Sequence, residues 1–164
     1  MSWLGRIPEP DCCARRALVV TNYPLSSLHG EAESVLEKIG ATNATQANEC
    51  FSVEADLSTL TGPQHLIDEA VKRTNGRKID ILVNNAGIAI MTRLKQITVD
   101  EWDRQVNLNG RGALLLTQAA LPHLAKGSRI VNLSSSGARQ PYAGSSIYNG
   151  AKSMIESFTR CSAV

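Results

Sequence analysis

The chain has 164 residues, of which 43% are hydrophobic, 20% charged and 4% aromatic. These fractions are close to those of globular proteins, which excludes a largely disordered, collagen-like or coiled-coil chain. The formal net charge is only +2, so the composition offers no electrostatic argument for binding nucleic acid or a membrane surface. No stretch approaches the roughly 18 apolar residues that a membrane-spanning helix requires.

The first residues of the chain differ from the rest. Residues 1–13 contain two prolines and no periodicity, so we expect a loose leader at 1–14 before a domain at 15–164. They lack the apolar stretch of a secretory signal, which favours a cytoplasmic location. The four cysteines form no C-x-x-C pattern and the three histidines have no ligand-like spacing, so we expect reduced thiols and no metal site.

From Arg15 onward, short apolar runs alternate with amphipathic segments. Runs rich in β-branched residues predict strands, and apolar residues at helical spacing predict helices. In chain order we expect a strand at 17–21, a helix at 31–39, a strand at 50–53, a helix from Pro63 to Asn75-Gly76, a strand at 79–83, a helix from Thr98 through Trp102, a helix at about 112–124, a strand at 129–133 and a helix at about 147–159. This alternation predicts parallel β-α-β units, and therefore an α/β protein with a doubly wound sheet.

Small polar residues follow three of the predicted strands, at Asp56, at 84–87 and at 134–136. In doubly wound sheets, ligands bind outside the carboxyl ends of the strands, so we expect these loops to face one crevice. Glycine among them lets the backbone approach a ligand closely.

Tyr148 and Lys152 are four residues apart in the last predicted helix and therefore share one of its faces. A tyrosine has a reference pKa of about 10 and does little proton transfer near neutrality. A neighbouring ammonium favours the phenolate and suits the residue to acid–base work. Such a pair can also simply cover a helix surface, and taken alone it leaves both interpretations open.

The pair does not stand alone, because Ser135 follows the fourth predicted strand and Asn84-Asn-Ala-Gly87 follows the third. Together these motifs resemble the short-chain dehydrogenase/reductase family over about residues 15–160. The resemblance implies a Rossmann-like fold and hydride transfer between a nicotinamide cofactor and a small-molecule carbonyl or alcohol. It implies that Tyr148 is the acid/base, that Lys152 lowers the tyrosine pKa and binds the nicotinamide ribose, and that Ser135 hydrogen-bonds the substrate oxygen.

The family's fourth catalytic position is an asparagine at a kink in the long helix, where it anchors a water-linked proton relay. Asn107 and Asn109 are the candidates, and Asn109 fits the family pattern better in register and in its offset from Trp102. Gly110 and Gly112 would permit the kink. The alternative is that the asparagine caps a helix.

The resemblance also implies cofactor contacts. Asn84, Ala86 and Gly87 would hold the central sheet together and border the cofactor, and Asp56 would meet the adenine amino group. A helix-capping Asp56 is an equal alternative. An acid at the end of the family's second strand would accept the ribose hydroxyls of NAD. Residues 21–24 contain none, and the stretch at 19–23 resembles NADP-preferring polyketide-ketone reductases, so we expect NADP rather than NAD.

The 12 glycines form neither G-x-G-x-x-G nor G-x-x-x-G-x-G, so the family's first strand, phosphate-binding turn and first helix are expected to be absent. The resemblance ends in the helix that carries Tyr148, so the C-terminal strand or strands are expected to be absent too. We therefore expect a short-chain dehydrogenase/reductase that is truncated at both ends. The resemblance implies a ketone reductase of secondary metabolism that forms a homo-oligomer through its two long helices. The alternatives are an inactive remnant acting as a scaffold or dimerisation module, and an incomplete gene model.

Overall fold

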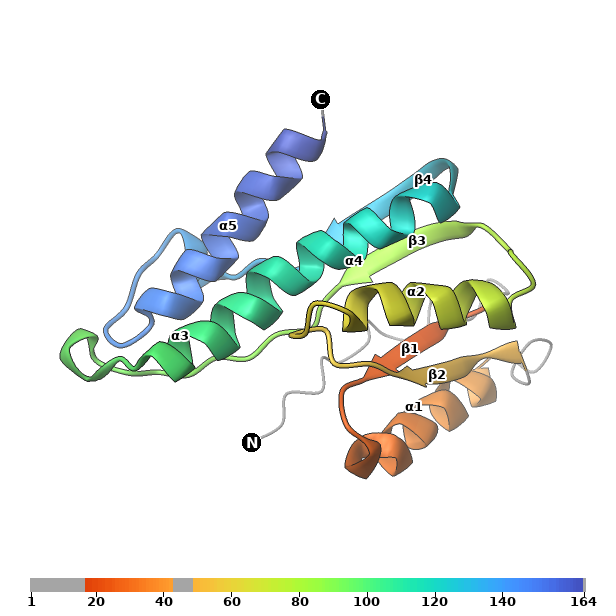
Figure 1. Ribbon diagram of the computed structural model, residues 1–164, viewed down its shortest axis with the longest axis horizontal. Helices are drawn as coiled ribbons and strands as arrows, with labels where there is room; N and C mark the ends of the chain where they lie inside the picture. The colour runs from red at the N-terminus through yellow and green to blue at the C-terminus, as the bar shows by residue number, and fades with distance from the viewer. Residues whose placement is uncertain (1–16, 43–48, 164) are drawn as a thin grey trace.

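The computed structural model describes residues 17–42 and 49–163, so the leader expected at 1–14 lies outside the described residues. Strands and helices alternate along the described chain (Figure 1). The main elements are β1 (Val20–Tyr23), α1 (His29–Thr42), β2 (Phe51–Glu54), α2 (Gly62–Arg73), β3 (Ile79–Asn84), α3 (Val99–Val106), a π-helical turn (Asn107–Gly112), α4 (Ala113–Ala120), β4 (Leu124–Asn132) and α5 (Ser146–Ser162). The predicted α/β class is confirmed.

The described strands form two parallel pairs, β1 with β2 and β3 with β4. The doubly wound fold has the strand order 3-2-1-4-5-6. In that order β2 and β1 correspond to strands 3 and 2, and β3 and β4 correspond to strands 4 and 5. No described strand corresponds to strand 1, whose place is between β1 and β3. Each of these two strands therefore has one edge without a partner strand among the described residues.

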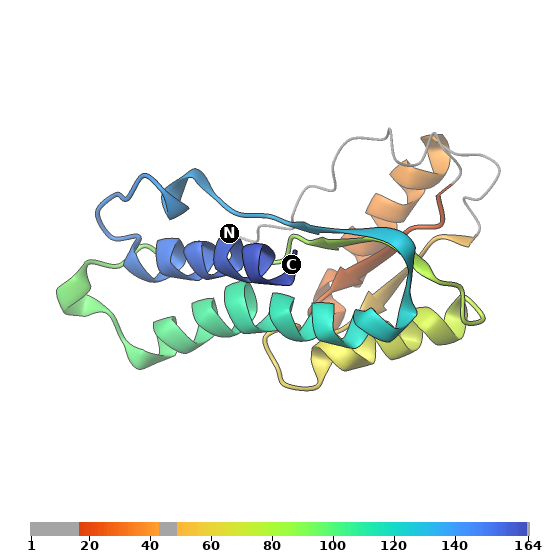
Figure 2. The ribbon, with the colours of Figure 1, turned by 90° about the horizontal axis from the view of Figure 1, so that it is seen from above.

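The helices cover the strands unevenly. α1 and α2 lie on opposite sides of the β1–β2 pair, while α4 packs on β3 and β4 beside α2, and α5 packs against β4 (Figures 1 and 2). The core forms between β2, α2 and α4, because alternate residues of the β2 segment point inward. Its buried members are Phe51, Val53, Ala55, Leu57, Leu66, Ile67, Leu116 and Ala120.

One face of the β3–β4 pair carries exposed apolar side chains. Ile81 is 57% exposed, Val83 41% and Val131 44%. Buried parallel strands ordinarily carry helices on both faces. The described elements therefore cover only the α4 face of this pair.

α3, the π-helical turn and α4 form one continuous helix from Val99 to Ala120, where the sequence had predicted two. The predicted start of this helix at Thr98 is confirmed, and a capping box forms there: Thr98 Oγ1 accepts from the Glu101 N–H and Glu101 Oε2 accepts from the Thr98 N–H, at 3.2 and 3.0 Å. None of the described helices has the length and apolar content needed to cross a membrane.

Three predicted boundaries were wrong. The long helix ends at Ala120 rather than near residue 124, because Pro122 lies in a 3-10 turn and proline has no N–H to continue an α-helix. β4 therefore begins at Leu124, before the predicted 129. β1 occupies Val20–Tyr23 rather than 17–21, because its pairing with β2 continues through Tyr23.

Candidate active site

Tyr148 and Lys152 lie in the first half of α5, on the face that meets the end of β4. The Lys152 Nζ atom is 6.0 Å from the centroid of the Tyr148 ring. The same Nζ donates a 2.7 Å hydrogen bond to the carbonyl oxygen of Leu133, directly after β4. Lys152 is buried and Tyr148 is half-buried, so the pair does not form an exposed helix surface.

Burial lowers the pKa of Lys152 below its ordinary value, because desolvation penalises the ammonium form. The Leu133 carbonyl oxygen offsets part of this penalty by accepting a hydrogen bond from the ammonium. The sequence did not identify this carbonyl, because a main-chain acceptor leaves no signal in residue types.

The serines after β4 have different partners. Ser134 Oγ donates a 2.9 Å hydrogen bond to Glu156 Oε1 on α5, one helical turn beyond Lys152. Ser135 Oγ instead accepts from the Gly137 N–H at 3.2 Å and begins a 3-10 turn. The described residues offer no acceptor to the Ser135 hydroxyl proton, so this group can donate to a ligand.

Asn109 lies in the π-helical turn and is 2% exposed. Its Oδ1 accepts from the Ile88 N–H at 2.8 Å, and its Nδ2 donates to the Ile88 carbonyl at 2.7 Å. Asn109 therefore holds the chain that leaves β3 and does not cap a helix. π-helical turns inside α-helices are frequent at functional sites.

Gly87 brings two of the predicted site residues together. A Cβ atom at this position would lie 2.9 Å from Asn109 Oδ1 and 3.6 Å from Lys152 Nζ. The backbone of Gly87 thus passes close to both the Asn109 amide and the Lys152 ammonium, after the carboxyl end of β3. A side chain there would displace one of them.

Asn84 is buried at the end of β3. Its Nδ2 donates to Asn132 Oδ1 on β4 at 2.7 Å and to Thr117 Oγ1 on α4 at 2.9 Å. These bonds join β3 to β4 and α4, and the role of Asn84 beside the cofactor stays a prediction. Its neighbour Ala86 is exposed at the same end of the strand.

Asp56 lies after β2 and is half-buried. Its Oδ1 accepts from the main-chain N–H and the hydroxyl of Ser58, at 2.9 and 2.7 Å. These bonds form an Asx turn and not a helix cap, because the next helix begins only at Gly62, so the expectation that Asp56 caps a helix is wrong. Its Oδ2 accepts no hydrogen bond from the described residues. Arg111 of the π-helical turn donates to the Ser58 carbonyl at 2.6 Å, which ties this turn to the Asn109 region.

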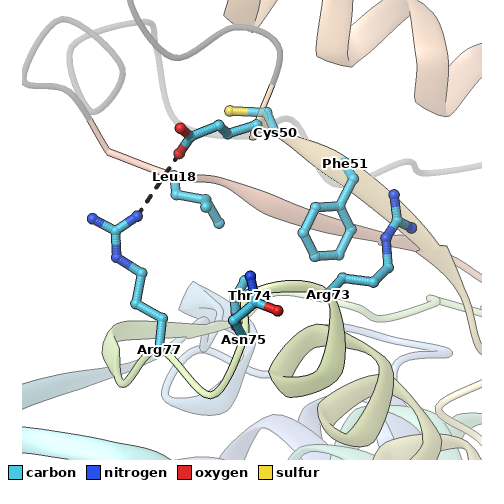
Figure 3. A pocket seen from close by; sticks show the side chains of 8 residues that line it. Leu18, Cys50, Phe51, Arg73, Thr74, Asn75 and Arg77 are labelled. Atoms are coloured by element: carbon cyan, nitrogen blue, oxygen red, sulfur yellow. Dashed lines mark ion pairs between the residues drawn. The ribbon is translucent and has the colours of Figure 1, made fainter.

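A cavity of about 490 Å³ lies at the opposite end of the β1–β2 pair, near the amino ends of these strands (Figure 3). The Arg73 guanidinium lies 3.8 Å from the centroid of the Phe51 ring, and Arg77 forms a 3.8 Å ion pair with Glu49. Because ligands of doubly wound sheets bind at the carboxyl ends of strands, this cavity is separate from the predicted site. No group of His, Cys, Asp and Glu side chains within residues 17–42 and 49–163 could hold a metal ion.

Comparison with known families matches residues 19–164 to the model of the short chain dehydrogenases. The chain belongs to the short-chain dehydrogenase family. Versicolorin reductase 1 of Dothistroma septosporum is 36% identical over 151 residues, which are 92% of this chain and 54% of that protein. The short-chain dehydrogenase/reductase FrzI of a Cladobotryum species is 41% identical over 108 residues, 66% of this chain and 41% of the relative.

A solved short-chain dehydrogenase from Burkholderia cenocepacia, in complex with NADP, is similar with a TM-score of 0.81 and 30% identity. The match covers 93% of this chain and 62% of that structure. This chain of the short-chain dehydrogenase family thus spans about half the length of the curated relatives it matches. The catalytic roles of Ser135, Tyr148, Lys152 and Asn109 stay predictions.

Proposed function

We propose that this chain carries the catalytic residues of an NADP(H)-dependent oxidoreductase that interconverts a ketone and a secondary alcohol. Membership of the short-chain dehydrogenase family supports the reaction class. A reductase name among the relatives and NADP in a similar structure support a ketone reductase of secondary metabolism. The observation that carries the proposal is the buried Lys152 ammonium between the Tyr148 ring and Gly87.

The residues at the carboxyl ends of β3 and β4 fit the nicotinamide half of the cofactor. Gly87 has no side chain beside Lys152, so a ribose could approach the ammonium closely. Lys152 would bind the ribose hydroxyls, Asn84 and Ala86 would border the cofactor, and Asp56 would accept from the adenine amino group through its available Oδ2. When bound, NADP(H) supplies or accepts the hydride.

Ser135 and Tyr148 act on the substrate oxygen. The Ser135 hydroxyl, whose proton has no acceptor among the described residues, donates a hydrogen bond to this oxygen. As hydride reaches the carbonyl carbon, Tyr148 transfers its phenolic proton to the oxygen, and the alcohol forms. In the reverse direction, the phenolate removes the alcohol proton, and Lys152 stabilises the phenolate through its positive charge.

Substitution of Tyr148 tests the assignment. In Tyr148→Phe we expect loss of turnover, followed as oxidation of NADPH in the presence of a ketone, with unchanged circular dichroism. Tyr142→Phe is the matched control, because Tyr142 is 49% exposed and lies outside the α5 pair, and it should retain full turnover. Turnover of the Tyr148→Phe chain at the parent rate contradicts the proposed function.

Cofactor affinity is expected to be weak, because the sequence has no glycine-rich turn to bind the pyrophosphate. Each missing charge-assisted hydrogen bond costs about 1.5–3 kcal/mol, so the loss of two lowers affinity by roughly 10²–10⁴-fold. Fluorescence titration with NADPH measures this directly. Absence of binding at millimolar NADPH excludes the enzymatic role for this chain.

A second candidate function is that of an inactive scaffold or dimerisation module. It is supported by a cavity of about 390 Å³ along α4, β4 and α5, beside Leu114, which is 43% exposed. A second copy could pack its own long helices there. Light scattering on the purified chain and on the Leu114→Glu variant tests this. The parent should be a dimer, and the substitution should weaken the dimer.

The alternative of an incomplete gene model is tested by searching the flanking genomic sequence for a coding frame with a glycine-rich turn.

A further inference from the structure

The side chains that hold the segment 88–92 form a regular series that includes two residues outside the predicted site. Asn109 holds Ile88 through both polar atoms of its side-chain amide, since Oδ1 accepts from the Ile88 N–H and Nδ2 donates to the Ile88 carbonyl. One helical turn earlier, Gln105 Oε1 accepts from the Ile90 N–H at 2.9 Å. One turn earlier again, Glu101 Oε1 accepts from the Thr92 hydroxyl at 2.7 Å.

The spacing of this series follows from backbone geometry. Four residues advance an α-helix by about 6 Å, and two residues advance an extended chain by about 6.6 Å. Residues 101, 105 and 109 can therefore meet residues 92, 90 and 88 in turn, with the two chains antiparallel. Figure 1 shows the chain after β3 running along the α3–α4 helix toward its start.

Gln105 is the middle member of the series and the most enclosed. Its side chain is 0% exposed, in a helix otherwise rich in polar residues. Its Nε2 makes only a long 3.5 Å contact with the Glu101 carbonyl, so the bond to Ile90 is its main interaction. The Thr92 hydrogen bond also lowers the pKa of Glu101, which favours the carboxylate that accepts it.

The segment 88–92 joins both sides of the candidate active site. It follows Gly87, which touches Asn109 and Lys152. At its other end, the Thr92 N–H donates a 2.9 Å hydrogen bond to the Gly144 carbonyl, in the chain that leads into α5 and Tyr148. This segment therefore connects the surroundings of Lys152 with the chain that leads into Tyr148.

We infer that Gln105 is a positioning residue for substrate binding: it holds the segment 88–92 as one wall of the carbonyl substrate site. The inference rests on the proposed function. The hydrogen bonds of Gln105 go to Ile90 and Glu101 and not to Gly87 or Tyr148, so we expect its loss to act on the substrate rather than on NADPH or on proton transfer.

The test replaces Gln105 by methionine in the whole chain, because methionine has a similar size and no strong hydrogen-bond acceptor. We expect the KM for a ketone to rise about tenfold, the effect of losing the hydrogen bond to the Ile90 N–H, with kcat and the KM for NADPH unchanged. The Ile90 amide should exchange with deuterium about tenfold faster, measured by NMR without substrate. Gln118→Met, at an exposed glutamine of α4, is the control and should change neither quantity.

Thr92→Val keeps the inference testable if Gln105→Met does not fold, because Thr92 is only half-buried and its hydroxyl forms the outer bond of the series. It should raise the ketone KM without changing kcat. Unchanged Ile90 exchange in Gln105→Met overturns the inference, as does a fall in kcat with no change in KM. If the parent chain has no turnover, the proposed function is overturned. If Ile90 nevertheless exchanges faster in Gln105→Met than in the parent, Gln105 still holds the segment 88–92.

Discussion

Replacing Gly112 by alanine tests the close contact between the long helix and the chain after β2. The added Cβ would collide with the Leu57 carbonyl oxygen and lie 3.2 Å from the Asn107 carbonyl oxygen. The Leu57 oxygen is a backbone atom outside the helix, so the helix must move away from it as a unit. Alanine gains about 1 kcal/mol over glycine in a helix, whereas overpacking costs about 1–3 kcal/mol. We take the upper end for a backbone collision and expect a net destabilisation of about 2 kcal/mol.

Gly150 provides the matched control, because it lies in α5 and no atom is within 4 Å of a Cβ added there. Gly150→Ala should stabilise the chain by about 0.5–1 kcal/mol. Urea unfolding followed by circular dichroism measures both, and the Gly112→Ala midpoint should fall by about 1 M at an unchanged slope. A Gly112→Ala chain as stable as the parent would show that this helix does not depend on the close approach and would refute the reasoning.

Two further predictions concern the buried polar side chains. Burial lowers the pKa of Lys152 below 10.5, so the folded chain binds fewer protons than the unfolded chain between these two pKa values. The stability of the parent relative to Lys152→Met should therefore rise as the pH increases toward 10.5, and a constant difference in unfolding free energy contradicts this. Asn84→Leu should cost about 2 kcal/mol and lower the melting temperature by roughly 4–8 °C, because Asn132 and Thr117 lose their donor. Asn85→Leu, at the half-buried neighbouring asparagine, is the control and should change the melting temperature less.

Local signals predicted most elements of the fold. The capping box of Thr98 and the glycine and proline positions marked helix ends, because these residues satisfy or lack specific backbone groups within one turn of the chain. Boundaries failed where a distant partner decided them. β1 continues through Tyr23 because β2 pairs with it, and that pairing joins residues about thirty positions apart.

In the candidate site, too, the sequence predicted the features that depend on local spacing and missed those that depend on a distant segment. The i, i+4 spacing placed Tyr148 and Lys152 on one face of a helix, and a motif drew attention to Asn109. The spacing of Glu101, Gln105 and Asn109 was equally regular, but nothing in the sequence showed that a second segment ran beside them. The meaning of this four-residue spacing becomes clear only once the path of residues 88–92 is known.

The sequence by itself determined the α/β class, the family resemblance and the residues of the candidate site, since these depend on residue types and short spacings. Tertiary structure alone decided that the described strands form two separate pairs, that Asn109 binds Ile88 rather than capping a helix, and that Lys152 is buried against the Leu133 carbonyl. These features depend on main-chain atoms and on contacts between distant segments. Hydrogen bonds to the backbone do not require a particular residue at the partner position, so the sequence pattern carries no record of them.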